Sequence, residues 1–379
     1  MATTHVFIVD EKTFPIHLQY MFAGTGSKSY NAPIDPSVSL MNKNFTSMVA
    51  DVMRIREGDK ILFYVQQGES DSGRFYGIFK ATSRFIFDDY SVPHPPNLNR
   101  MLPFRVKICP DEVYEKGIPE WDVLDDYEKV TSTGKIFELQ WSLIYRKLKG
   151  VRGCTMITNY ESERLCNLLR RDNRHLTGHS FNFDSVHRQI TLSESTSHIN
   201  NHNIPVDILS AMNSIKENGH RFEVQLQAYI LQHIGDGKNE SLDNCIFPHG
   251  TPLFWLGNEV SCGLGMRRID ILIISKICND IHIYPIELKT TKADASYLNQ
   301  IHNYLKWIKL YVTPNLSTSS IFIEPILITL GESRKRRKFR EFKQELLRCS
   351  FNEFNENRLT VSQTKHIQFS ISQDNITFK

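Results

Sequence analysis

The sequence predicts a mixed α/β and α+β protein of two domains, because strand and helix patterns alternate in both halves of the chain. A chain of 379 residues is longer than one hydrophobic core usually spans. The halves are separated by a polar stretch rich in His, Asn and Ser that lacks apolar periodicity. We therefore predict an N-terminal domain at residues 1–168, a polar linker at 169–204 and a C-terminal domain at 205–379.

Composition narrows the class of protein. With 40% hydrophobic residues the chain can pack two interiors, and its seven cysteines are scattered singly. Scattered cysteines suit a reducing compartment and argue against a zinc ribbon or a disulfide scaffold. No apolar run approaches the roughly 18 residues of a membrane span. We expect a soluble, cytoplasmic protein with no membrane partner. The formal charge of +3 is nearly neutral, so binding of nucleic acid must depend on local basic clusters.

The N-terminal domain is predicted to be a small sheet followed by a helix. Strand patterns occur at HVFIVD (5–10), KILFYV (60–65), GRFYGIFKAT (73–82), PFRVKI (103–108) and FELQWSLI (137–144). The turn-rich QQGESDSG between the second and third of these indicates a hairpin. TNYESERLCNLLRR (158–171) has apolar residues at helical spacing, and either Thr158 or Asn159 can cap that helix.

The C-terminal domain is predicted to be a sheet flanked by helices. Helix patterns occur at VDILSAMNSI (206–215), HRFEVQLQAYILQHI (220–234), ADASYLNQIHNYLKWIKLYV (293–312) and the basic segment at about 333–349. Two buried strands, IDILII (269–274) and IHIYPIELK (281–289), flank the polar SKICND and form a hairpin-like pair, and IFIEPILIT (321–329) predicts a further strand.

The hairpin carries three charged residues, Asp270, Glu287 and Lys289, inside segments that are otherwise apolar. Charged side chains are rarely buried unless they are paired or bind a metal. Glu287 and Lys289 are two residues apart and share a face of the strand, and an antiparallel partner strand brings Asp270 beside them. Two adjacent carboxylates repel unless a cation lies between them. The pattern therefore predicts a site for Mg²⁺, or Mn²⁺, with a lysine that positions water or stabilises a phosphate.

The order of these residues resembles the core of PD-(D/E)XK nucleases, in which a first acid precedes an (E/D)xK on the next strand. Asp270 matches the first acid and Glu287-Leu288-Lys289 matches the ExK. Glu223 matches the helical acid that many members use, and Gln300 and Tyr304 match a QxxxY element. The context, covering about residues 205–332, is most similar to NucS-type endonucleases. The resemblance implies metal ligation by Asp270, Glu287 and Glu223, with Lys289, Gln300 and Tyr304 completing the catalytic site.

The N-terminal half resembles the PUA-like superfamily, in particular its EVE and YTH branches. Gly58-Asp59-Lys60 precedes a strand as in those families, and Gly73, Phe75 and Gly77 supply a second motif. The resemblance covers about residues 4–168 and implies a small barrel whose loops enclose a modified base. The implied pocket residues are Phe22, Thr25, Asn31, Ser83, Phe85, Phe87 and Tyr90. Phe22 stands where YTH members favour tryptophan, and each phenylalanine also fits a core position.

Two basic clusters are candidate contacts with the nucleic-acid backbone. They are Arg146, Lys147, Lys149 and Arg152 in the first domain, and Lys335, Arg336 and Arg337 at the start of the basic helix. A charge cluster of this kind is also common on an ordinary solvated surface.

Together the two resemblances predict a metal-dependent DNA endonuclease that selects its site through a modified base, similar to a modification-dependent restriction enzyme. We expect a homodimer, since cutting both strands usually requires two active sites. Two alternatives stay open: a NucS-like repair endonuclease acting on mismatched or branched DNA, and a catalytically inactive protein that binds DNA or RNA. RNA is also a candidate substrate, because YTH-type pockets recognise RNA bases in other settings.

Overall fold

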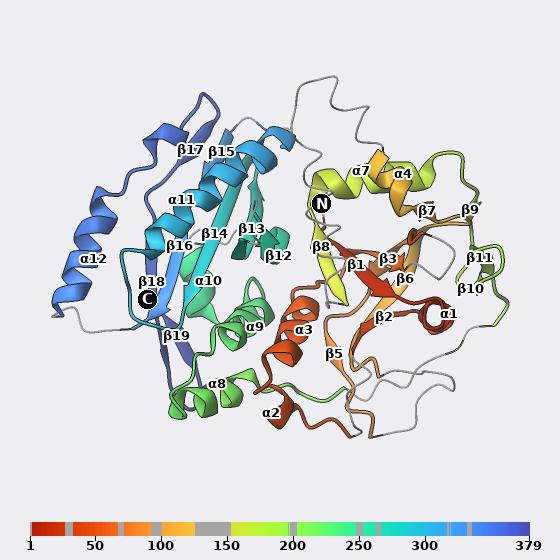
Figure 1. The fold of residues 1–379 in the computed structure, drawn as a ribbon, viewed down its shortest axis with the longest axis horizontal. Coiled ribbons are helices and arrows are strands. Elements are labelled where there is room, and N and C mark those ends of the chain that lie inside the picture. Colours follow the sequence, from red (N-terminus) through yellow and green to blue (C-terminus); the bar gives the residue numbers. More distant parts are fainter. Residues whose placement is uncertain are drawn as a thin grey trace. The chain divides into compact units, whose positions relative to one another are not determined.

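A computed structural model describes residues 2–26, 33–66, 72–91, 101–125, 153–195, 197, 203–247, 253–262, 267–316, 318, 320–331 and 336–379. The chain divides into two compact units (Figure 1). Unit 1 comprises Met1–Ser39 and Asp51–Val206, and unit 2 comprises Leu40–Ala50 and Asp207–Lys379. Each unit combines a sheet with helices, so the predicted mixed α/β class is confirmed. In the described part of the chain no helix is both long and apolar enough to cross a membrane.

Unit 1 is built on a curled sheet (Figure 1). Its strands are β1 (Thr4–Val9), β2 (Phe22–Thr25), β3 (Lys60–Val65), β4 (Arg74–Ala81), β5 (Ile86–Phe87), β6 (Phe104–Tyr114), β7 (Ile118–Pro119), β8 (Cys154–Ile157) and β9 (His175–Leu176). Its helices are α1 (Phe14–Gln19), α2 (Pro36–Ser39), α4 (Glu120–Asp125) and α7 (Asn159–Arg170); α3 (Lys43–Met53) passes from unit 2 into unit 1 after Ala50. The strand order is β2-β6-β4-β3-β1-β8, with β1 and β3 parallel.

The predicted strands at residues 5–10, 60–65, 73–82 and 103–108 are present as β1, β3, β4 and β6. The predicted strand at 137–144 lies outside the described residues. Helix α7 begins as expected after Thr158, whose side chain accepts the backbone N–H of Glu161 while the Glu161 carboxylate accepts that of Thr158. This reciprocal capping satisfies two N–H groups that would otherwise lack partners.

Part of the segment predicted to be a linker is folded, which corrects that prediction. Strands β10 (Phe181–Asp184) and β11 (Gln189–Leu192) pair within unit 1, and β9 pairs with β6. Phe183 is buried and packs its ring edge against Phe14, with centroids 5.0 Å apart. A hairpin this short exposes most of its polar residues, so its few inward phenylalanines give little periodic signal.

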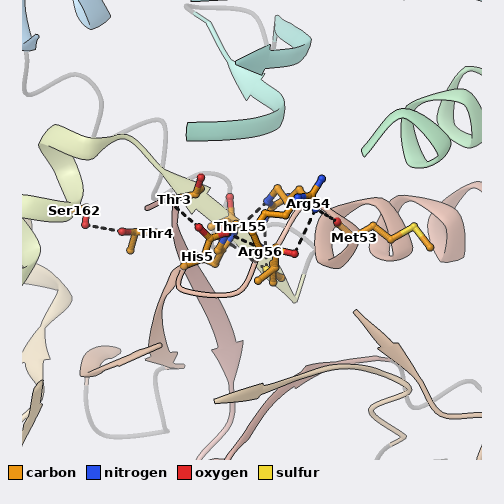
Figure 2. Close-up of polar contacts among 11 residues, drawn as sticks. Thr3, Thr4, His5, Met53, Arg54, Arg56, Thr155 and Ser162 are labelled. Carbon is orange, nitrogen blue, oxygen red and sulfur yellow. Dashed lines mark hydrogen bonds and ion pairs between the residues drawn. The ribbon is translucent and has the colours of Figure 1, made fainter. Parts of the chain in front are cut away.

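A buried polar network joins β1 to the end of α3 and to the turn before β3 (Figure 2). The fully buried Arg54 pairs with Asp51 at 2.9 Å, and its Nε donates to His5 Nδ1 at 3.3 Å. Nε2 of His5 therefore carries the proton that it shares with Asp59, 2.8 Å away. Burial lowers the pKa of His5, so the ring is neutral near neutral pH. Asp59 of the predicted Gly58-Asp59-Lys60 motif thus anchors the first strand, since it also accepts the Thr3 N–H.

Unit 2 has a mixed sheet between helices. Its strands are β12 (Leu253–Ser261), β13 (Arg268–Ile277), β14 (Asp280–Lys289), β15 (Ser320–Ile323), β16 (Ile326–Leu330), β17 (Leu359–Val361), β18 (Lys365–Ile371) and β19 (Ile376–Phe378). Its helices are α8 (Ile208–Glu217), α9 (Glu223–His233), α10 (Glu240–Ile246), α11 (Tyr297–Trp307) and α12 (Arg337–Arg348). A π-helical turn, Ile308–Val312, continues α11. The strand order is β12-β13-β14-β16-β18-β19.

Strands β12, β13 and β14 form antiparallel neighbours, whereas β14, β16 and β18 run parallel. The predicted hairpin is therefore confirmed as β13–β14. The single strand predicted at 321–329 is instead two strands, β15 and β16, interrupted at Glu324 and Pro325. Proline cannot donate to a ladder, which favours a break at this point.

Helices cover both faces of the sheet in unit 2 (Figure 1). On one face the Tyr304 hydroxyl of α11 contacts Glu287 of β14, and Phe342 of α12 packs on His366 of β18. On the other face Phe222, at the start of α9, packs on Phe369 of β18. Glu287 and Lys289 of β14 therefore lie under α11, on the face that α12 also covers.

Candidate active site

The β13–β14 hairpin brings Asp270 next to Glu287. At the open end of the hairpin the last paired residues are Ile271 and Ile286. Asp270 and Glu287 follow them directly, so the register places these two residues opposite each other. Beyond this pair a side chain takes the place of a backbone acceptor between the two strands: Asp270 Oδ2 accepts the backbone N–H of Leu288 at 2.7 Å. Asp270 thus joins the two strands at the end of the hairpin and also lies beside Glu287.

Glu287 is held by two side chains from its own unit. Its Oε1 lies 2.5 Å from Lys289 Nζ, and its Oε2 accepts a hydrogen bond from the Tyr304 hydroxyl. That hydroxyl is also 2.9 Å from the carbonyl oxygen of Arg268 on β13. Glu287 is 1% exposed, whereas the Lys289 side chain is 17% exposed. The lysine is therefore the member of this pair that solvent or a ligand can reach.

The electrostatics of the site follow from burial and from crowding of like charges. Burial, followed by the charge of Glu287, raises the pKa of Asp270 well above its ordinary value. Burial alone would lower the pKa of Lys289, but Glu287 and then Asp270 outweigh it, and the pKa is raised. Burial and the neighbouring charge therefore favour the protonated form of Asp270, and the two carboxylates keep Lys289 in its charged form. Titratable groups perturbed in this way are frequent at functional sites.

Helix α9 contributes two side chains one turn apart. Gln227 is buried, and its Nε2 donates to the carbonyl oxygen of Asp270 at 2.8 Å. The charge of Glu223 contributes to the raised pKa values of Asp270 and Lys289. Yet nowhere in the described chain are three His, Cys, Asp or Glu side chains grouped closely enough to hold a metal ion. Glu223 thus does not join Asp270 and Glu287 in one ligand group, contrary to the predicted three-carboxylate set.

The two adjacent carboxylates nevertheless fit a hard divalent cation, because such a cation would offset both the burial of the Asp270 charge, which is the main cause of its raised pKa, and its repulsion by Glu287. A thiol nucleophile does not fit the site. Burial raises the pKa of Cys262 to about 12, so this neighbouring thiol stays protonated.

The structure separates the two residues of the predicted QxxxY element. The Tyr304 hydroxyl contacts Glu287, whereas the Gln300 side chain is exposed and has no hydrogen-bond partner among the residues that the structure describes. Two contacts were not expected from the sequence. Gln227 occupies the i+4 position from Glu223, a spacing that could have indicated it. Tyr297 places its ring 5.4 Å from Lys289 Nζ, for which the sequence has no comparable signal.

In unit 1, two of the aromatic residues predicted to enclose a modified base instead pack against an arginine. The guanidinium of Arg105 lies 5.2 Å from the Phe22 ring centroid and 5.3 Å from that of Tyr90. Arg105 is fully buried and pairs with Asp88 at 2.9 Å. The space next to these two aromatic rings is therefore occupied by an arginine whose positive charge is balanced by Asp88.

The other predicted pocket residues are mostly core or backbone-bonded. Phe87 is fully buried against Phe104, and Phe85 stacks on the same ring at 6.3 Å with part of its surface exposed. Thr25 is buried, and Ser83 Oγ accepts the Lys107 N–H at 2.9 Å. Asn31 lies outside the described residues.

Most of the predicted backbone contacts also lie outside the described residues. These are Arg146, Lys147, Lys149, Arg152 and Lys335. Arg336 and Arg337 are exposed at the start of α12.

Comparison with known proteins gives few matches. No family model matches the chain, and no curated protein matches it. Among solved structures, the human THYN1 protein in complex with DNA containing 5-methylcytosine is 10% identical, with a TM-score of 0.27 over 45% of this chain and 99% of that one. A hypothetical protein from Leishmania major is 8% identical, with a TM-score of 0.28 over 44% of this chain and 94% of that one.

Proposed function

We propose that the chain is a metal-dependent endonuclease that hydrolyses phosphodiester bonds in DNA at Asp270, Glu287 and Lys289. The observation that carries the proposal is the contact of a buried acid pair with a partly exposed lysine at the end of one hairpin. A divalent cation bound to the carboxylates would polarise the scissile phosphate and lower the pKa of an attacking water. Asp270 and Glu287 are the residues that would hold it.

The remaining contacts define what the chain's own residues do in this mechanism. Lys289, once released from Glu287, can donate to a phosphate oxygen or orient the water, because its ammonium is at the accessible side of the pair. Tyr304 fixes the Glu287 carboxylate, and Gln227 fixes the backbone of Asp270. Both act as positioning residues that hold the acids in place.

The finer proposal is that unit 1 selects the cutting site by binding a modified base. Its support is the pair of sequence motifs around Gly58 and Gly73 and the curled sheet on which both lie. Among the candidate wall residues, Phe85 and Tyr90 keep part of their surface exposed, whereas Phe22 and Phe87 do not. We therefore favour Phe85 over Phe22 as a surface on which a base could stack.

The test is cleavage of unmodified, methylated and mismatched duplexes with Mg²⁺ or Mn²⁺. We expect metal-dependent cutting of modified duplex that is lost in Asp270→Ala and retained in Asp280→Ala, a matched change at the far end of β14. Cutting confined to mismatched duplex would instead support a repair nuclease. Cutting that survives Asp270→Ala would refute this site.

One observation favours a second function, that of a nucleic-acid binder without cleavage. Both oxygens of Glu287 already have partners in Lys289 and Tyr304, and Asp270 accepts a backbone N–H. The three residues could therefore serve only to close the hairpin. Duplex binding without cutting in any metal, and unaffected by Asp270→Ala, would support that function.

A further inference from the structure

Helix α12 has an apolar face that is packed and a basic face that is not. Phe339, Phe342 and Leu346 are buried, as expected for one stripe of an amphipathic helix. Around the rest of its first turns the exposed side chains are mainly basic. We call the exposed residues Arg336, Arg337, Lys338 and Arg340 the basic face.

The charge of α12 is concentrated at one end. Arg337 pairs with Glu341 at 2.7 Å, and at the other end Arg348 pairs with Glu345 at 3.0 Å. Within the described chain Arg336, Lys338 and Arg340 form no ion pair. The C-terminal half of the helix carries a net charge of +1 from Lys343, Glu345 and Arg348, and most of the positive charge lies in the first turns.

This arrangement opposes the stability of the helix. The N-terminal end of a helix carries partial positive charge, so acidic residues stabilise the first turn and basic ones destabilise it. The first turn of α12 contains no acidic residue, and Arg336 at the N-cap position makes no capping hydrogen bond. The basic face therefore needs an explanation other than helix stability.

Helix α12 lies on the sheet face that carries the acid pair. The Phe342 ring meets His366 edge-on, with centroids 4.9 Å apart. His366 pairs with Leu327 across one strand boundary, and Leu327 pairs with Glu287 across the next. Since paired residues of neighbouring strands point to the same side, His366 and Glu287 share a face.

The basic face also lies toward the same end of that sheet. β14 and β16 are parallel and end at Lys289 and Leu330, and α12 is the next helix after β16. The loop after Lys289 contains Asp294, whose pKa is lowered by hydrogen bonds from Ser296 and, further, by the charge of Lys338. The start of α12 is therefore within electrostatic reach of the loop that leaves the candidate active site.

We propose that the basic face of α12 binds the phosphate backbone of the same DNA duplex that places its scissile phosphate at Asp270 and Glu287. This inference depends on the proposed function for its partner, duplex DNA, but it can be measured without cleavage. Phosphates neutralised by Lys or Arg release counterions, which makes the affinity fall as salt rises.

The experiment measures binding of a fluorescent duplex by the full chain at several salt concentrations, without divalent metal. We expect Arg340→Gln to reduce the slope of log affinity against log salt by about 0.9, the value for one phosphate contact. Arg348→Gln, which removes the same charge from the paired end of the helix, should leave the slope unchanged. The triple variant Arg336→Gln, Lys338→Gln, Arg340→Gln should reduce it by about 2.7 on the same basis.

Equal slopes for Arg340→Gln and Arg348→Gln, or an unchanged slope for the triple variant, would overturn the proposal. All substituted residues are exposed, so circular dichroism and a thermal melt can verify that each variant is folded. A reduced slope in a chain that cuts no DNA would leave this surface established and reject the nuclease activity alone. The two proposals can therefore fail separately.

Discussion

The Lys289 ammonium lies 2.5 Å from a carboxylate oxygen of Glu287, and both side chains leave the same face of β14. The lysine thus supplies the positive charge that a buried carboxylate requires. It also occupies space next to the oxygen that a metal would use. A cation and Lys289 should therefore compete for Glu287.

The first prediction follows from this competition. Lys289→Met should bind Mn²⁺ several times more tightly than the natural chain at pH 8, because the metal no longer displaces an ammonium. The same variant should lose cutting by about 100-fold or more, as expected when a donor to the transition state is removed. Titration calorimetry or the Mn²⁺ electron paramagnetic resonance signal measures the affinity. Weaker Mn²⁺ binding would show that Lys289 supports the metal site and does not compete with it.

The second prediction concerns the raised pKa of Asp270. When the pKa of a carboxyl group is higher in the folded state than in the unfolded state, its protonated form stabilises the fold. This contribution to the unfolding free energy is fully present below the ordinary carboxyl pKa and is lost as pH rises through the raised value. Asp270→Asn removes the charge but keeps an oxygen for the Leu288 N–H. Without metal, the variant should melt at a higher temperature than the natural chain at pH 8. The shift should be about 2 to 4 °C for each kcal/mol of unfolding free energy that the substitution adds. The difference should shrink toward zero at pH 4.

Asp280→Asn provides the control for this experiment, since Asp280 begins β14, the neighbouring strand, at the end away from the acid pair. It should show no such gain. A lower melting temperature for Asp270→Asn at pH 8 would mean that the charged carboxylate stabilises the hairpin, and that burial and repulsion do not destabilise it.

The third prediction separates the two residues of the QxxxY element. Tyr304→Phe removes the hydroxyl that holds Glu287, and we expect a 10- to 100-fold loss of metal affinity or cutting, the usual effect of losing a supporting hydrogen bond. Gln300→Ala should change neither, because Gln300 is exposed. Equal losses in both variants would show that the element acts as one unit when substrate is bound.

The sequence was sufficient for the hairpin that carries the site. Apolar runs of strand length fixed β13 and β14, and a two-residue spacing put Glu287 and Lys289 on one face. The partners Gln227 and Tyr297 could not be obtained in the same way. Their contacts depend on how α9 and α11 cross the sheet, which local periodicity does not determine.

In unit 1 even fewer of the contacts between distant residues could be predicted from the sequence. Aromatic residues at strand positions suggest either a core or a base pocket, and the sequence does not show what fills the space between them. Arg105 lies on β6, far in sequence from Phe22, and its position between Phe22 and Tyr90 results from strand pairing. Short strands such as β10 were missed because two inward phenylalanines are too few to define a period.

The fourth prediction tests whether Arg105 is a core residue of unit 1. Its pair with Asp88 is fully buried, so Arg105→Met should leave the buried Asp88 carboxylate without its arginine and cost about 3 to 5 kcal/mol of unfolding free energy. Arg170→Met breaks the exposed pair with Glu112 and should cost about 1 kcal/mol or less. Urea denaturation of the full chain measures both. If Arg105→Met costs no more than Arg170→Met, the guanidinium is dispensable to the core, and the space between Phe22 and Tyr90 is available to a base.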